Sequence, residues 1–156
     1  MNHQWAAITA GALLATLVAS HGWAQEIAIQ NTRGLSFGSF VAGSGGSVAV
    51  SPSGLRSAGG DVLLLRSGEG FAAEFTVTGD TQATYTIQLP GDDFVTLTGP
   101  GSGMVINAFT SAPSGAGGQL SAGGTQTLTV GGALNVGSAQ TPGVYAGTFS
   151  VILNYN

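Results

Sequence analysis

Gly143-Val-Tyr-Ala-Gly-Thr-Phe-Ser-Val-Ile-Leu-Asn-Tyr155 is the stretch of this sequence that decides the fold. Apolar residues occupy alternate positions in it, with small or polar residues at positions 146, 148, 150 and 154 between them; the apolar set is Tyr145, Phe149, Val151, Leu153 and Tyr155. A period of two is the spacing of a β-strand whose side chains point alternately to core and solvent. An apolar strand with an open edge invites pairing with another chain, so this one needs a neighbouring strand. We therefore expect the rest of the chain to supply a sheet.

The chain begins with the pattern of a secretory signal peptide. A short polar head precedes an apolar run over residues 6–19, and Gly22-Trp23-Ala24 places small residues on both sides of a bulky one. The run is 14 residues long, shorter than the ~20 that a helix needs to cross a bilayer. We interpret residues 1–24 as a signal peptide cleaved after Ala24, although its head lacks Lys and Arg; a retained anchor is the alternative. Residues 25–156 then form a single domain, exported to the periplasm, the outer surface or the extracellular medium.

The composition of residues 25–156 excludes several classes of function. This part of the chain has no Cys, His, Lys or Trp, and the formal net charge of the protein is −4. Nucleic acids and anionic membranes bind clustered Lys and Arg, so we expect neither partner and no stable membrane insertion after cleavage. Charged residues make up 6% of the chain, against about 25% in typical soluble domains. Without disulfides, stability must come from burial and from the hydrogen-bond ladders of the sheets.

Short alternating segments separated by Gly-, Ser- and Pro-rich turns recur along residues 27–156. They predict an all-β fold, an antiparallel immunoglobulin-like β-sandwich. A parallel β-solenoid is the rival, but the Gly-Gly pairs show no fixed period. Gly38, inside the apolar segment 35–40, predicts a β-bulge or a close backbone approach. The continuous apolar run Val62-Leu-Leu-Leu65 predicts a strand buried on both faces or at the centre of the sandwich.

Residues 25–156 lack the side chains that most catalytic sites use. A serine nucleophile needs a base, usually His, and a zinc site needs His or Cys, and residues 25–156 contain neither. Asp92-Asp93 could contribute to a calcium site, but Asp after Pro-Gly is also ordinary turn chemistry. Carboxylates for glycoside hydrolysis exist at Glu69, Glu74 and Asp80, of which Glu74 occupies an exposed strand position. We expect no enzyme, no cofactor and no metal.

The C-terminal stretch resembles the signature of chaperone–usher pilus subunits. Counted back from Asn156, the matching positions are second, fourth, sixth, eighth and fourteenth: Tyr155, Leu153, Val151, Phe149 and Gly143. A wider pattern is similar to a family of small secreted bacterial proteins known only as a domain of unknown function. That family is similar in outline to spore coat protein U and pilin-like proteins. The pattern includes Leu35-Ser-Phe-Gly38, Tyr85-Thr-Ile-Gln-Leu-Pro90 and Val130-Gly-Gly-Ala-Leu134.

The resemblance implies an immunoglobulin-like fold, export and a role in surface appendages. It implies strand-pairing or partner contacts at Gly143, Tyr145, Phe149, Val151, Leu153 and Tyr155. Pilins of this type often carry a disulfide and a longer N-terminal donor strand; here only Ile27 and Ile29 alternate as a candidate donor.

Two hypotheses about function follow. The first is a structural or adhesive subunit of a cell-surface appendage or coat, assembling by β-strand pairing with like subunits or a periplasmic chaperone. The alternative is a self-sufficient, monomeric secreted binding module that contacts its ligand through loops 52–60 and 110–124.

Overall fold

In the computed structural model of the protein, residues 6–12, 26–114 and 117–156 are described. All elements assigned among these residues are β-strands. In chain order the strands are β1 (Ala6–Ala12), β2 (Ala28–Arg33), β3 (Leu35–Val41), β4 (Gly46–Val50), β5 (Arg56–Gly60), β6 (Leu63–Leu64), β7 (Ala73–Thr78), β8 (Thr84–Gln88), β9 (Val95–Leu97), β10 (Met104–Ala112), β11 (Gly118–Gln119), β12 (Thr125–Val136), β13 (Gly143–Phe149) and β14 (Ile152–Tyr155). The predicted all-β class is confirmed for these residues. They include no helix long and apolar enough to span a bilayer.

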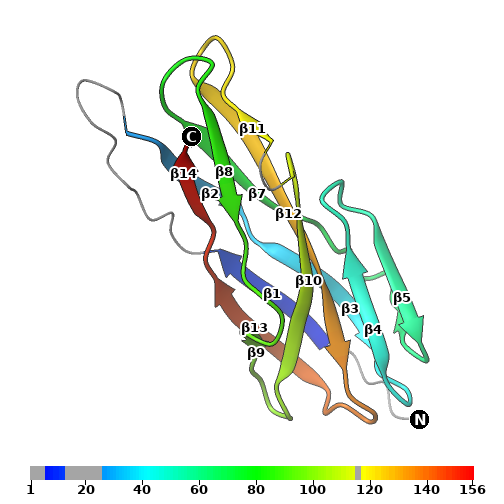
Figure 1. The fold of residues 1–156 in the computed structure, drawn as a ribbon. Coiled ribbons are helices and arrows are strands. Elements are labelled where there is room, and N and C mark those ends of the chain that lie inside the picture. Colours follow the sequence, from blue (N-terminus) through cyan, green and yellow to red (C-terminus); the bar gives the residue numbers. More distant parts are fainter. Residues whose placement is uncertain (1–5, 13–25, 115–116) are drawn as a thin grey trace.

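The largest sheet has the strand order β2-β7-β12-β10-β9 (Figure 1). Its longest strand, β12, pairs with β7 over residues 125–130 and with β4 over residues 132–136. The β4–β5 hairpin is thereby attached to this sheet. On its other edge β12 pairs with β10, which continues to β9.

Two smaller sheets complete the described fold, with the strand orders β13-β1-β3-β6 and β11-β8-β14. Among the described strands every ladder is antiparallel except the parallel pair β1–β13. A backbone bridge between Thr98 and Ala146 joins the chain just after β9 to β13, with N···O distances of 2.9 and 3.0 Å. This bridge ties the largest sheet to the sheet that contains β13.

One hydrophobic core receives side chains from all three sheets. Buried and half-buried residues alternate along β7, and in β8 the buried positions are Tyr85 and Ile87. The polar residues between them, largely Thr, face away from the core, as the period of two predicts. Burial and backbone pairing thus take the place of the missing disulfides.

A bulge in β3 brings two phenylalanines to the same core. Phe37 and Phe40 are both buried, although a spacing of three would place them on opposite faces of a regular strand. The β1–β3 register pairs Ile8 with Gly38 and Thr9 with Ser36, so Phe37 is the extra residue. Gly38 has a φ of +72°, which glycine adopts at no steric cost. The bulge predicted at Gly38 is confirmed.

Arg56 ties this bulge to the nearby segment that contains Leu65. Its guanidinium Nη1 donates to the carbonyl oxygens of Phe37 and Ser39, both at 3.1 Å, and Nη2 donates to that of Leu65 at 2.8 Å. Charge-assisted hydrogen bonds of this kind are stronger than neutral ones. Burial lowers the pKa of the Arg56 guanidinium, and the carboxylate of Glu69 opposes that shift. The single arginine therefore holds three carbonyls around the bulge in one arrangement.

Two sequence expectations about the middle of the chain are wrong. In the run 62–65 only Leu63–Leu64 forms a strand, β6 lies at a sheet edge, and the Leu63 side chain is 64% exposed. A short apolar run does not specify which neighbours cover it. The expected loop 52–60 contains β5, and the expected loop 110–124 contains the end of β10 and all of β11. Small and glycine-rich residues there pair as strands because neighbouring ladders extend to them.

We expect Gly38→Ala to lower the free energy of unfolding by about 2–4 kcal/mol, from left-handed backbone strain plus a steric clash. The added Cβ would collide with Arg56 Nη1 and the carbonyl oxygen of Gly68. Gly54→Ala is the matched control, because Gly54 has a φ of +89° but no atom within 4 Å of such a Cβ; it should cost only about 1 kcal/mol. Urea unfolding of the full chain measures both, and equal losses would contradict the clash.

Candidate functional site: the acceptor edges of β3 and β13

The C-terminal stretch is two strands in the structure, where the sequence predicts one. β13 ends at Phe149 and β14 begins at Ile152, and the two belong to different sheets. The alternation continues across the break, since Tyr145, Phe149, Val151 and Leu153 are all buried. Tyr155 is half-buried and packs against the core. Burial of the alternating set is confirmed except for this partly exposed last member, and its role in partner contacts stays a prediction.

β1 lies between β3 and β13 and joins them (Figure 1). It runs parallel to β13, from the pair Ala6–Gly143 to the pair Ala12–Phe149, and antiparallel to β3. We call the two strand edges that face β1 the acceptor edges. β3 and β13 are not neighbours in the sheet, so β1 supplies the pairing partner of both.

The position of β1 matters because it falls inside the predicted signal peptide, residues 1–24. Cleavage after Ala24 would remove this strand and leave both acceptor edges without their partner. Exposed strand edges of this kind are templates for pairing with another chain. The sequence predicts the leader, but an apolar run alone gives no sign that it pairs as a strand.

The acceptor edges carry large apolar side chains into the core. Leu35, Phe37 and Phe40 from β3 and Tyr145 and Phe149 from β13 are at most 3% exposed with β1 in place. The Phe149 ring packs at a tilt against Phe109, with 5.1 Å between centroids, and edge-on against Phe75 at 6.5 Å. Removal of β1 would therefore uncover backbone groups next to an apolar interior.

The Tyr145 hydroxyl, near the start of β13, forms hydrogen bonds with its full donor and acceptor capacity. Tyr145 Oη donates to the carbonyl of Thr141 at 2.6 Å and accepts from Gly101 N at 3.0 Å and from Gln140 Nε2 at 3.1 Å. Gln140 Nε2 also donates to the carbonyl of Ser102 at 2.6 Å. One donor and two acceptor sites are all that a tyrosine hydroxyl offers. The network ties β13 to residues 101–102 and 140–141, and the bridge at Ala146 ties it to Thr98.

The candidate donor residues Ile27 and Ile29 serve the chain's own fold here. Ile27 is 2% exposed, and Ile29 lies in β2, which pairs with β7. The structure therefore does not bring them to the acceptor edges. Their role as a donor strand to another subunit stays a prediction.

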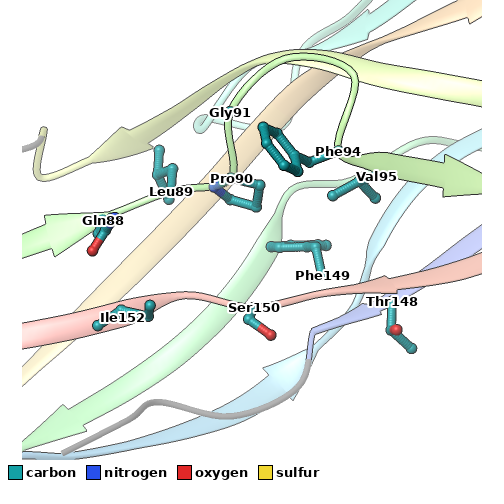
Figure 2. Close-up of a pocket in the computed structure, with 10 residues that line it drawn as sticks. All are labelled: Gln88, Leu89, Pro90, Gly91, Phe94, Val95, Thr148, Phe149, Ser150 and Ile152. Carbon is teal, nitrogen blue, oxygen red and sulfur yellow. The ribbon is translucent and has the colours of Figure 1, made fainter.

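A second site candidate is a surface pocket of about 460 Å³ between residues 88–95 and 148–152 (Figure 2). The β8–β14 ladder ends at the pair Gln88–Ile152, and beyond this pair the two segments no longer pair with each other. The Phe94 side chain is 84% exposed at this pocket, whereas Phe149 is buried in its wall. Sequence reasoning missed this site because two diverging strands create it. The available signal was an aromatic residue directly after a Pro-Gly-Asp-Asp turn.

Asp92 and Asp93 both form hydrogen bonds to residues of β10. Asp92 Oδ1 accepts from Ala108 N at 2.9 Å, and Asp93 N donates to Asn107 Oδ1 at 2.8 Å. Asp92 and Asp93 themselves lie in a turn, and the two bonds attach this turn to β10. Among the described residues no group of three or more His, Cys, Asp or Glu could hold a metal ion.

Fold and site together define an all-β domain in which β1 (residues 6–12) pairs with both β3 and β13. The chain belongs to the family described as a domain of unknown function (DUF4402), whose model matches residues 27–155. β1 lies outside the matched range. No curated protein and no solved structure matches this chain. The wider likeness to spore coat protein U and pilin-like proteins stays a prediction.

We expect Tyr145→Phe to lower the free energy of unfolding by about 1–3 kcal/mol, because it leaves the half-buried N–H of Gly101 and the buried amide of Gln140 without this acceptor. Tyr155→Phe is the matched control. Its hydroxyl accepts from Asp80 N at 2.9 Å in a more exposed place, so the loss should be about 1 kcal/mol or less. Chemical denaturation of the full chain measures both, and a larger loss at Tyr155 would contradict the assignment.

Proposed function

We propose that this protein is an exported structural or adhesive subunit of a cell-surface appendage or coat, and that it assembles by accepting a β-strand at the acceptor edges of β3 and β13. One observation carries the proposal: the strand that joins these edges comes from residues 6–12, inside the predicted signal peptide. The family domain, which begins at residue 27, supports the same division of the chain.

The physical argument is the cost of leaving the acceptor edges empty. Backbone N–H and C=O groups next to a buried core need partners, and each one left without a partner costs free energy. A strand from another chain satisfies both edges at once, with main-chain hydrogen bonds supplying affinity. The partners we propose are like subunits or a periplasmic chaperone. The scarcity of charged side chains fits association through backbone pairing.

The proposal also includes the type of all-β fold. We infer an immunoglobulin-like, pilin-like β-sandwich that β1 completes in the full chain. The antiparallel sheets, the shared core and the C-terminal spacing from Gly143 to Tyr155 support it. On this reading the protein is not an enzyme, and export precedes assembly.

Comparison of purified residues 25–156 with the full chain tests the proposal. We expect the full chain to be a monomer, and the shorter chain to polymerise or to melt about 10 °C or more lower, because its acceptor edges are unpaired. Light scattering after size exclusion and repeated thermal melts measure this. A shorter chain that stays monomeric and refolds reversibly at the melting temperature of the full chain would refute strand acceptance.

Matched substitutions in the full chain separate pairing from mere length. Ile8→Pro removes a ladder donor in the middle of β1 and should reproduce the behaviour of residues 25–156. Ser20→Pro, outside β1 but within the predicted leader, should leave the full chain unchanged. If both variants behave alike, strand pairing by β1 is not what stabilises the monomer.

The pocket beside Phe94 favours one alternative, a self-sufficient secreted binding module. Its lining is mostly apolar and carries no charged side chain. That module would remain a stable monomer as residues 25–156, so the comparison above also decides between the two functions.

A further inference from the structure

We propose that Arg56 fixes the register in which a donor strand pairs with the acceptor edge of β3. This inference rests on the proposed function and deepens it, because it assigns a residue that positions one of the two acceptor edges. Arg56 lies on β5, outside the sheet that contains β1 and β3. Its effect on a donor therefore passes through the backbone of β3.

The backbone of β3 is offset by one residue at its bulge. Ser36 exchanges two hydrogen bonds of 2.9 Å with Phe71, and Ser39 bonds at 2.9 and 3.1 Å to the segment 65–68. Both serines thus pair on the edge of β3 that β6 also occupies. In a regular strand the main-chain groups of successive residues face opposite edges, so residues three apart would not share an edge. Phe37 is the extra residue that makes this arrangement possible.

A donor strand without a bulge of its own meets this offset directly. In the β1–β3 register Ala7 is opposite Ser39 and Thr9 is opposite Ser36, a step of two residues on β1 against three on β3. If the bulge were lost, a donor held at Ser39 would bring its next alternate residue opposite Phe37. The bulge therefore decides the register along the first half of β3.

Two side chains hold the bulge in place. A bulge leaves main-chain groups outside the ladder; here Arg56 Nη1 donates to the carbonyl oxygen of Phe37 at 3.1 Å, and Ser36 Oγ accepts from Gly38 N at 3.2 Å. The same Nη1 donates to the carbonyl oxygen of Ser39 at 3.1 Å, so both carbonyls point toward one nitrogen. Loss of Arg56 would leave the Phe37 carbonyl beside the core without this donor, which penalises the bulged register.

The Arg56 side chain is itself held in one position. Nη2 donates to the carbonyl oxygen of Leu65 at 2.8 Å. A Cβ at Gly70 would lie 3.0 Å from Arg56 Cδ, and one at Gly38 would collide with Nη1. A guanidinium presents its donors in a fixed plane, whereas a lysine ammonium is a point charge on a flexible stem. The site therefore needs arginine and not merely a cation.

Engineered disulfides can report this register, because the chain has no cysteine of its own. Ala7→Cys with Ser39→Cys reports the half of β3 after the bulge, and Thr9→Cys with Ser36→Cys reports the half before it. Both pairs are directly opposed in the Cα register. Opposed residues of an antiparallel ladder lie within the Cα separation that a disulfide allows.

Each cysteine pair is placed in the otherwise native full chain, in Arg56→Met and in Arg66→Met; Arg66 is exposed and is the matched control. Mass spectrometry after mild oxidation measures the intramolecular disulfide yield. We expect Arg56→Met to lower the 9–36 yield at least about threefold and to leave the 7–39 yield within about 1.5-fold, since one lost hydrogen bond shifts an equilibrium by such a factor. Arg66→Met should change neither yield. An unchanged 9–36 yield in Arg56→Met, or an equal fall of both yields, would overturn the inference.

Arg56→Lys provides the second test where Arg56→Met does not fold. It keeps the charge without the planar fork, so the 9–36 yield should fall at least about twofold relative to the 7–39 yield; equal yields would overturn the inference.

The outcomes separate the two proposals. The disulfides are read with β1 in the same chain, so the role of Arg56 can fail while strand acceptance stands. If residues 25–156 remain a stable, reversible monomer, strand acceptance fails, and the inference about a donor fails with it whatever the disulfide yields.

Discussion

Backbone pairing on both sides of β13 is the constraint on which the rest of this structure depends. On one side the bridge between Thr98 and Ala146 ties it to the end of β9; on the other, β1 pairs with it along its whole length. A chain with 6% charged residues and no cysteine has few other means of stabilisation. Its free energy of folding must come from apolar burial and from ladders that leave no buried backbone group without a partner.

β13 also connects the parts of the fold. Tyr145 and Phe149 place it in the shared core, its hydroxyl network orders residues 101–102, and the chain continues directly into β14 in another sheet. Opening the β1 side would thus act on the core and on the sheets that meet there. This coupling is the reason that we assign function to the acceptor edges and give second place to the pocket beside Phe94.

Periodicity was sufficient to predict the strand class, the buried C-terminal alternation and the bulge at Gly38. It could not separate β13 from β14, because the inward positions keep the same parity across the break. It failed for Leu63, since an apolar run does not reveal that its strand lies at an edge. The pairing of β1 was beyond sequence reasoning for a related reason: the identity of a neighbouring strand is a property of the sheet as a whole.

Residues 6–12 show how far the surroundings of a segment can decide its secondary structure. Alanine and glycine, which dominate this segment, are poor strand formers. Intrinsic preference therefore does not explain why it is a strand. The explanation lies in its surroundings, where the edges of β3 and β13 offer backbone groups on both sides of the segment. Main-chain pairing with both edges therefore outweighs the low intrinsic strand propensity of this segment.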